Sequence, residues 1–551
     1  MKPLPRGGCA FSAILLAALE LGAPAFPEEK REPLSEEIVL QATRAPDRYL
    51  LGWHEYRSQH FLVDSDLPGW MVAELIRKLE KLRAVELRCL LTKDVPIPGR
   101  VRVIASSTPL LFSELARDRF FIGSFARCQT YQMNCRWLMY DEVIYANGSR
   151  RGGCTDDLFV AANYFVSRLG EPIIVLPVAG GSVHAEVIAH EVAHYLASVS
   201  FFQPPPWFRE GFASFVQTIG SDPLENPPPT GTHIRSGERV MEGAVGLAPP
   251  GLMAALCRDH VSAGEALTWD GEESSTRPGR YHAQSWLLYH WLWNMRSSGL
   301  SEFQRRLANA ENPDLAWRQA FPEFDPQRPG GVASLDKALL RYELNLSGSI
   351  YYRRKAEPDT RYTESALPPS DVHVLLLDAR YSVQPQKLDW LGPELTKLLE
   401  EEPLQAEGIS WRADIDRTSP VLLLRKAVEK FPRDWRAWLM LGRAEEDGDR
   451  KLVAFQTAVK LNPDSAPAHS ELALLLASSE HPSDAFPFAK RATELAPWDA
   501  GATVALARIA AILNACDEAI EMHKRAMRLG ARADLHVQLD EVIGRCSAPR
   551  N

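Results

Sequence analysis

The sequence lacks several features that would place a protein at once in a familiar class. After the first 25 residues it holds no run of eighteen apolar residues, so we expect no integral membrane span in the rest of the chain. No basic stretch carries interleaved aromatic residues and the net charge at pH 7 is −9, so we expect no nucleic-acid partner. None of the eight cysteines has C-x-x-C spacing, so nothing indicates a cysteine-based metal site.

The composition that is present is that of a globular protein with several domains. Hydrophobic residues make up 45% of the chain and charged residues 24%, which is ordinary for a globular protein. A length of 551 residues predicts two to four domains.

The first 25 residues have the three parts of a secretory signal peptide. Lys2 and Arg6 are basic, residues 10–22 are mostly apolar, and Ala23-Pro-Ala25 has the small-x-small form of a cleavage site. We therefore expect the protein to be exported, either to a periplasm or to the extracellular space. An uncleaved membrane anchor is the alternative.

Seven cysteines remain after the signal peptide, and export would allow them to form disulfides. A bridge between Cys516 and Cys546 would close the C-terminal region, and Cys128, Cys135 and Cys154 lie close enough in sequence for a local bridge. The odd number leaves at least one thiol free or available to another chain.

The segment His190-Glu191-Val-Ala-His194 is typical of a metal-binding helix. Two histidines four residues apart lie on one helical face and can bind one metal ion, and Glu191 can reach a water held by that ion. A short apolar strand is predicted just before it, at residues 171–177. The helix itself is predicted by apolar residues that recur at helical spacing, namely Val183, Val187, Ile188, Val192, Tyr195 and Leu196.

A second helix is predicted to supply the third metal ligand. Prolines 204–206 favour a helix start, which places Glu210 in the first turns. Two imidazoles and one carboxylate would leave a fourth position open for water, as in catalytic zinc sites. The alternatives are that His190 and His194 are ordinary histidines, that Glu210 pairs with Arg209, or that the site binds zinc without turnover.

These motifs resemble those of gluzincin-type zinc peptidases. H-E-x-x-H followed by P-x-W-[FL]-x-E-G-x-A is most similar to the bacterial peptidase MA-like group, which includes the domain known as DUF1570; the match is specific over residues 183–217. The resemblance implies a zincin-like α+β fold, with Zn²⁺ held by His190, His194 and Glu210 and with Glu191 as catalytic base. Those peptidases with a thermolysin-like site have an Asp four residues after the ligand Glu, and this chain has Ser214 there.

Fainter parts of the resemblance concern the substrate. Tyr281-His-Ala-Gln-Ser285 is similar to a segment that follows the metal helices in such proteins, and Tyr281 is a candidate donor to the tetrahedral oxyanion, with a core role as the alternative. For His282 and His290 core or surface roles are favoured over a role in the site. Residues 173–176 or 140–145 could form the edge strand that pairs with an extended substrate. No G-x-M-E-N motif occurs, which favours an endopeptidase over an aminopeptidase.

The C-terminal third has a 34-residue period. Pro463 and Pro497 are 34 residues apart, and Trp438-x-x-Leu441-Gly442 matches the opening of a tetratricopeptide (TPR) repeat. About three repeats across residues 420–545 resemble the TPR family, whose concave face usually holds a protein or peptide; a purely structural stack is the alternative. Small residues recur where paired helices would cross, namely Ala458, Ala485, Ala492, Ala519 and Ala526.

The predicted fold is thus an α+β zincin-like metallopeptidase domain followed by an all-α TPR solenoid. Strands are predicted at residues 59–64, 100–105 and 372–377, and helices at 68–91, 281–295 and 393–402. The predicted parts are a signal peptide (1–25), a flexible N-terminal segment (26–50), the peptidase domain (51–347), a connecting α/β segment (348–419) and the TPR repeats (420–546).

The predicted function is zinc-dependent hydrolysis of peptide bonds in a protein or peptide substrate. Zinc would activate a water, and Glu191 would take its proton and pass it to the leaving amine. The alternative is a catalytically inactive, exported TPR scaffold that carries a peptidase-like domain.

Overall fold

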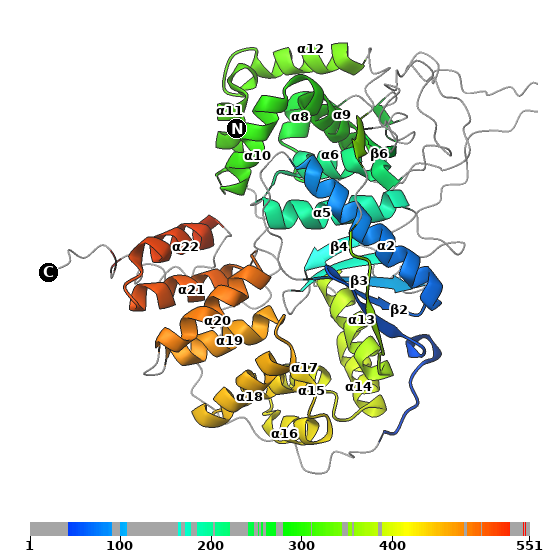
Figure 1. The fold of residues 1–551 in the computed structure, drawn as a ribbon, viewed down its shortest axis with the longest axis vertical. Coiled ribbons are helices and arrows are strands. Elements are labelled where there is room, and N and C mark those ends of the chain that lie inside the picture. The colour runs from blue at the N-terminus through cyan, green and yellow to red at the C-terminus, as the bar shows by residue number, and fades with distance from the viewer. Residues whose placement is uncertain are drawn as a thin grey trace, which may run out of the picture. The chain divides into compact units, whose positions relative to one another are not determined.

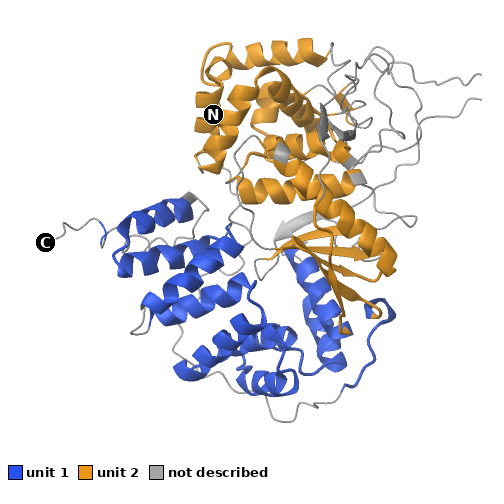
Figure 2. Cartoon of the chain, viewed as in Figure 1, with its two compact units in different colours: residues 1–50, 369–551 blue, residues 51–368 orange. Residues whose placement is uncertain are grey.

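The computed structural model divides the chain into two compact units (Figures 1 and 2). Unit 2 comprises residues 51–368, and unit 1 comprises residues 1–50 and 369–551. The structure describes residues 42–90, 100–106, 163–166, 171–177, 185–201, 204–220, 241–246, 252, 255–256, 261–271, 279–309, 311–343, 351–354, 358–383, 388–478, 482–497, 499–528, 544 and 546.

A mixed sheet lies in unit 2, and its described strands are ordered β4-β5-β3-β2-β1-β8. The middle strands β2, β3 and β5 are parallel, whereas β1, β8 and β4 join antiparallel at the two sides. The strands are β1 (His54–Arg57), β2 (Phe61–Ser65), β3 (Val101–Ser106), β4 (Asn163–Val166), β5 (Pro172–Pro177) and β8 (Thr363–Ala366). The strands predicted from residues 59–64, 100–105 and 171–177 are confirmed as β2, β3 and β5.

One predicted edge strand is wrong. Residues 173–176 lie in β5, which pairs with β3 on one side and β4 on the other. A continuous apolar run is typical of a strand that is buried on both faces, so it does not indicate whether the strand lies at an edge of the sheet. Among the described strands β4 is last in order on this side; the other candidate, residues 140–145, lies outside the described residues.

Two helices cover one face of this sheet (Figure 1). Helix α2 (Gly69–Glu86) continues into the 3₁₀ turn η2 (Leu87–Cys89), which confirms the helix predicted over 68–91. Helix α5 (Ala185–Ser200) carries the H-E-x-x-H segment and packs against α2, β4 and β5. The predicted apolar face of α5 is confirmed, because its described members are all buried: Val187, Ile188, Val192, Tyr195 and Leu196.

The remaining helices of unit 2 share one hydrophobic core with α2 and α5. Its aromatic centre joins Trp207 and Phe208 to Phe303 and Trp317, with ring centroids 5.5 to 6.0 Å apart. The helices are α6 (Pro206–Val216), α8 (Ala263–Leu267), α9 (Arg280–Met295), α10 (Ser297–Ala308), α11 (Pro313–Ala320) and α12 (Gly331–Glu343). Helix α9 confirms the helix predicted over 281–295, and β6 (Met241–Val245) pairs with β7 (Tyr351–Arg354).

The strand predicted at residues 372–377 is wrong. This segment lies in helix α13 (Pro369–Val383), where Val374 and Leu377 pack onto α14 (Leu391–Glu401). A short apolar run fits a buried strand and a buried helix equally well, so periodicity alone does not separate them. Helix α14 confirms the helix predicted at 393–402.

The described part of the predicted flexible segment 26–50 is held in place by α14. The backbone N–H of Thr43 donates to the Glu400 carbonyl at 2.8 Å, and Arg44 Nε lies 3.5 Å from a Glu401 carboxylate oxygen. The 3₁₀ turn η1 (Arg48–Leu50) follows, with Leu50 fully buried. The predicted connecting segment 348–419 is also divided, since β7 and β8 belong to unit 2 and α13 opens the C-terminal part of unit 1.

The C-terminal part of unit 1 is a stack of helical pairs. Each of the small residues predicted at helix crossings is buried, and a Cβ atom on Gly442 would lie 2.5 Å from the Phe455 ring, so α17 and α18 approach closely there. The helices are α15 (Ala406–Asp416), α16 (Val421–Lys430), α17 (Trp435–Ala444), α18 (Gly448–Leu461), α19 (Ala466–Ala477), α20 (Pro482–Leu495), α21 (Ala500–Ile512) and α22 (Cys516–Arg528). The all-helical, repeated architecture predicted for this region is confirmed.

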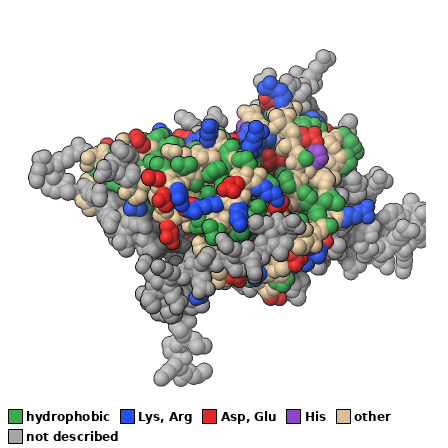
Figure 3. Space-filling model, turned by 90° about the horizontal axis from the view of Figure 1, so that it is seen from below, with side chains coloured by type: hydrophobic (Ala, Val, Ile, Leu, Met, Phe, Trp, Pro, Cys, Tyr) green, Lys and Arg blue, Asp and Glu red, His purple; other side chains and the backbone are tan. Residues whose placement is uncertain are grey.

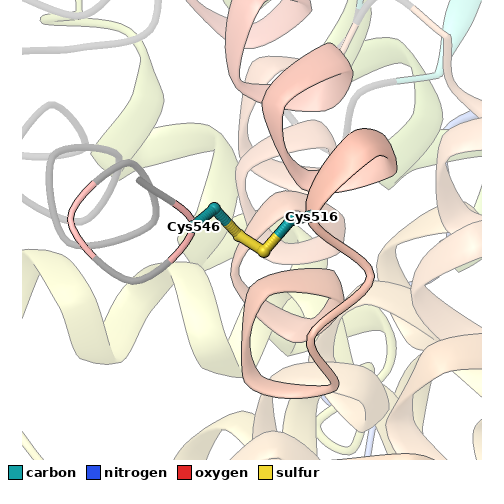
Figure 4. Close-up of a disulfide and its surroundings, with 2 residues drawn as sticks. All are labelled: Cys516 and Cys546. Carbon is teal, nitrogen blue, oxygen red and sulfur yellow. A yellow bond between two sulfur atoms is a disulfide. The ribbon is translucent and has the colours of Figure 1, made fainter. Parts of the chain in front are cut away.

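The predicted disulfide between Cys516 and Cys546 is present (Figure 4). It links the start of α22 to the segment beyond the repeats, with the two Cα atoms 5.3 Å apart. Cys89 is buried and not part of a disulfide, and its thiol donates to the Val85 carbonyl at 3.7 Å. The other cysteines after the signal peptide lie outside the described residues: Cys128, Cys135, Cys154 and Cys257.

Two surface expectations can be compared with the described part of the chain. None of its helices has the length and apolar character that crossing a membrane requires. On the face shown in Figure 3, Lys and Arg side chains are interspersed with Asp and Glu rather than gathered in one patch. The predicted signal peptide, residues 1–25, lies outside the described residues.

Glu86, at the end of α2, predicts a measurable pH dependence of stability. Its side chain is fully buried without a hydrogen-bond partner in the described structure, and burial raises its pKa well above the ordinary value. Above the ordinary pKa the unfolded chain loses this proton while the folded chain keeps it, so stability falls as the pH rises. We expect Glu86→Met to raise the free energy of unfolding at pH 8 by about 1–3 kcal/mol, and by less at pH 4, in urea unfolding.

The control is Glu74→Met on the same helix, where the side chain is exposed and paired with Arg77. This change should produce no gain in stability. A gain for Glu86→Met that is the same at both pH values would contradict the burial of an uncharged carboxyl group.

Candidate metal centre

Helix α5 places its two histidines on the side that faces α6. The rings of His190 and His194 lie 4.6 Å apart between centroids and nearly perpendicular to each other, at 83°. This follows from the i, i+4 spacing, which stacks side chains on successive turns of one face. Glu191 lies one residue further round and is also buried, with 2% of its surface exposed.

Helix α6 brings Glu210 to both histidines. Pro206 at the first helical position and the buried side chains of Trp207 and Phe208 fix the first turn of α6 in the core. Glu210 Oε2 then lies 3.6 Å from His190 Nε2 and 3.6 Å from His194 Nε2. The structure thus brings together the three ligands that the sequence predicts.

This arrangement fits a zinc ion. The potential ligand atoms of His190, His194 and Glu210 all lie within 4.8 Å of one another. Two ligand atoms about 2.1 Å from a tetrahedral zinc ion are about 3.4 Å apart, close to the two 3.6 Å separations. Two imidazoles and a carboxylate also form the set of donors that catalytic zinc sites use.

Burial sets the protonation that such a site requires. Burial lowers the pKa of His194 to about 3, against the opposing effect of Glu210, so the imidazole is neutral at pH 7. Burial opposes ionisation of Glu210, but the nearby imidazoles, His194 and His282 foremost, hold its pKa well below the ordinary value. Neutral imidazole and ionised carboxylate are the forms that bind metal ions.

The structure places His282 beside Glu210, which the sequence analysis did not predict. Its Nε2 atom lies 3.2 Å from Glu210 Oε2, the same oxygen that faces His190 and His194. The sequence analysis favours a core or surface role for this histidine and does not predict its contact with Glu210. The adjacent Tyr281 contacts other groups: its ring stacks on Trp269 at 5.1 Å, and its hydroxyl accepts a hydrogen bond from Arg280 at 3.2 Å. The role predicted for Tyr281 in oxyanion binding stays a prediction.

Gly211 explains how α9 comes so close to Glu210. A Cβ atom at this position would lie 2.5 Å from the carbonyl oxygen of Ser285 and 2.9 Å from the Cβ atom of Tyr289. Only a residue without a side chain allows the two helices to cross at this distance. Gly211 of the E-G-x-A segment and Ser285 of the Tyr-x-x-Gln-Ser segment therefore meet at one crossing, which places His282 beside Glu210.

Gln217 is a second residue that the sequence analysis missed. It lies at the C-terminal cap of α6, and its Oε1 atom lies 3.0 Å from His190 Nδ1. The spacing from Glu210 could have indicated Gln217, because residues seven apart lie on the same face of a helix and Gln217 follows Glu210 by seven. Ser214, which occupies the position of the Asp in thermolysin-like sites, is buried.

Comparison with known proteins finds likeness in solved structures alone. No protein-family model matches the chain, and no curated protein matches it. A thermophilic TPR protein of Thermus thermophilus shares 20% identity, with 32% of this chain and 97% of that chain covered and a TM-score of 0.24. MamA shares 19%, with 29% and 91% covered and a TM-score of 0.23. Yeast Tom70 shares 14%, with 49% and 60% covered and a TM-score of 0.26. None of these findings identifies a peptidase domain.

The helix crossing at Gly211 predicts a linked loss of stability and metal binding. In Gly211→Ala the new methyl group would force α6 away from α9, so Glu210 would shift relative to both His282 and the α5 histidines. We expect a loss of about 1–3 kcal/mol in the free energy of unfolding, the usual cost of overpacking, together with a lower zinc content by elemental analysis.

Gly69→Ala is the matched control. A Cβ atom at Gly69 would meet only the Tyr56 hydroxyl, at 3.8 Å. That variant should keep its stability and its zinc. If Gly211→Ala were as stable and as zinc-loaded as the parent protein, the close crossing would not hold the site together.

Proposed function

We propose that this protein is a zinc-dependent peptidase. The observation that carries the proposal is the convergence of His190, His194 and Glu210 on one point, with Glu191 next to the first ligand on the same helix. Three protein ligands would leave one position for water or substrate, whereas structural zinc sites use four. The resemblance of these segments to those of gluzincin-type peptidases supports amide hydrolysis as the reaction.

The residues of the chain would divide the chemistry between them. His190, His194 and Glu210 would hold the zinc ion, which supplies Lewis-acid activation of a water and of the scissile carbonyl. Glu191 would accept the proton from that water and deliver it to the leaving amine. Burial of Glu191 keeps bulk water from competing for this proton transfer.

Other features support the expected surroundings of the enzyme. Strand β4 has β5 on one side and is last in the sheet order among the described strands, so it offers backbone groups to an extended peptide substrate. The disulfide Cys516–Cys546 suits the exported location that the signal-like residues 1–25 predict, because disulfides persist outside the cytosol.

A second function is supported by the helical stack. Paired helices packed on small residues, as at Gly442 and Phe455, build a continuous surface that can hold a protein or peptide partner. In the alternative to a peptidase, this surface does all the work and the protein is an inactive exported scaffold. Turnover and its dependence on Glu191 separate the two proposals.

Replacing Glu191 should separate metal binding from catalysis. We expect the purified chain without residues 1–25 to contain about one zinc per molecule and to cleave a mixture of unfolded proteins. Glu191→Gln should keep the zinc and lower the cleavage rate at least about 100-fold, the lower end of the usual contribution of a general base. Zinc is measured by elemental analysis and cleavage by mass spectrometry of the products.

Two outcomes would count against the peptidase. Cleavage by Glu191→Gln at the parental rate would show that Glu191 is not the base. A parent protein that holds no zinc after reconstitution would leave the scaffold as the better proposal.

Replacing Glu210 should instead remove the metal. Glu210→Ala takes away one of three ligands and leaves the imidazoles of His190 and His194 without their shared carboxylate. We expect zinc affinity to fall at least about 100-fold, in line with the tenfold to hundredfold cost of losing even an outer partner. Glu302→Ala, on the exposed side of α10, is the control and should bind zinc as the parent does.

A further inference from the structure

The side chain of Gln217 is aimed at the back of the first metal ligand. Its Oε1 atom lies 3.0 Å from His190 Nδ1, while the other ring nitrogen, Nε2, faces Glu210. An amide oxygen only accepts hydrogen bonds, so His190 Nδ1 carries the ring proton and donates a hydrogen bond to Gln217 Oε1. That tautomer leaves the Nε2 lone pair free to point to the proposed metal position.

We propose that Gln217 is a positioning residue for the metal centre, which holds His190 in the orientation and tautomer that bind zinc. The inference rests on the proposed zinc site. It also adds to that site, because thermolysin-like sites use an Asp four residues after the ligand Glu and this chain has Ser214 there. Here the contact is made one turn later on the same helical face, seven residues after Glu210.

The structure explains why this position can reach His190. Helix α6 ends at Val216, and the backbone N–H of Gln217 still donates to the Ala213 carbonyl, so Gln217 keeps its place on the last turn. The following 3₁₀ turn η3 (Gln217–Gly220) packs directly against α5. The backbone at Gln217 is therefore fixed, and its side chain needs little further ordering to contact the ring.

An amide in this place has a different electrostatic effect from a carboxylate. Glu210 already brings a negative charge to the site. Gln217 orients His190 without adding a further negative charge, so the imidazole binds a metal ion less strongly than one whose other nitrogen donates to a carboxylate. We therefore expect zinc to be bound less tightly than it would be with a carboxylate in place of the Gln217 amide.

The test measures zinc affinity by competition with a chromophoric chelator, with no need of a substrate. We expect Gln217→Ala to raise the zinc Kd about 10–100-fold, which is the usual cost of losing an outer-shell partner. Gln217→Glu should restore the contact and bind zinc at least as tightly as the parent, because a carboxylate accepts the same proton and makes the imidazole more basic.

The matched control is Gln304→Ala. Gln304 is fully buried in the same unit, and its amide donates to the Tyr289 hydroxyl at 3.1 Å, away from the metal ligands. This variant should lose stability and keep the parental zinc Kd. Circular dichroism shows whether each variant is folded, and Gln217→Met, similar in length to glutamine, replaces Gln217→Ala if the smaller side chain prevents folding.

The outcomes separate the two proposals. A parental zinc Kd in folded Gln217→Ala or Gln217→Met would overturn the positioning role and leave the zinc site intact. Weaker binding in Gln217→Glu than in the Ala variant would also overturn it, because the contact would then be harmful. A parent protein that binds no zinc would overturn the proposed function itself.

Discussion

The close crossing of α6 and α9 is the constraint on which the candidate site depends. Gly211 allows the backbone of α6 to meet the Ser285 carbonyl at a distance that no side chain would permit. The crossing sets the relative positions of Glu210 and His282. Glu210 precedes Gly211 by one residue, and His282 precedes Ser285 by three. Helix α5 then needs only its i, i+4 spacing to bring two imidazoles to the same carboxylate oxygen. Packing between helices thus comes first and the polar geometry follows from it.

Burial decides the chemistry of this cluster. A histidine in water is partly protonated near neutral pH, but burial keeps His194 neutral while the surrounding imidazoles keep Glu210 ionised. Further contacts surround these side chains: Gln217 Oε1 accepts a hydrogen bond from His190, and His282 lies against Glu210. A pair of histidines on an exposed helix would have none of these features, although its sequence motif would be identical.

The helical stack of unit 1 depends on a different rule. Small residues every 34 positions allow paired helices to touch, and aspartate or serine caps start several of them. Each pair meets mainly its neighbours, so a local sequence pattern is enough to predict the architecture. The sheet of unit 2 is the opposite case, because β1 pairs with β8 although about 300 residues separate them.

The sequence by itself determined the parts that depend on local periodicity and motif spacing: the helix that carries the H-E-x-x-H segment, the start of the helix that carries Glu210, the repeated helices and the cysteine pair 516–546. Tertiary structure alone decided the rest. Residues 372–377 form part of a helix, where Val374 and Leu377 pack onto α14. An apolar run alone cannot distinguish such a helix from a buried strand. Strand β5 is internal because β4 pairs with its free edge, and the sequence of β5 does not indicate this pairing. The contacts of His282 with Glu210 and of Gln217 with His190 run between helices, and they exist only once α5, α6 and α9 have packed together.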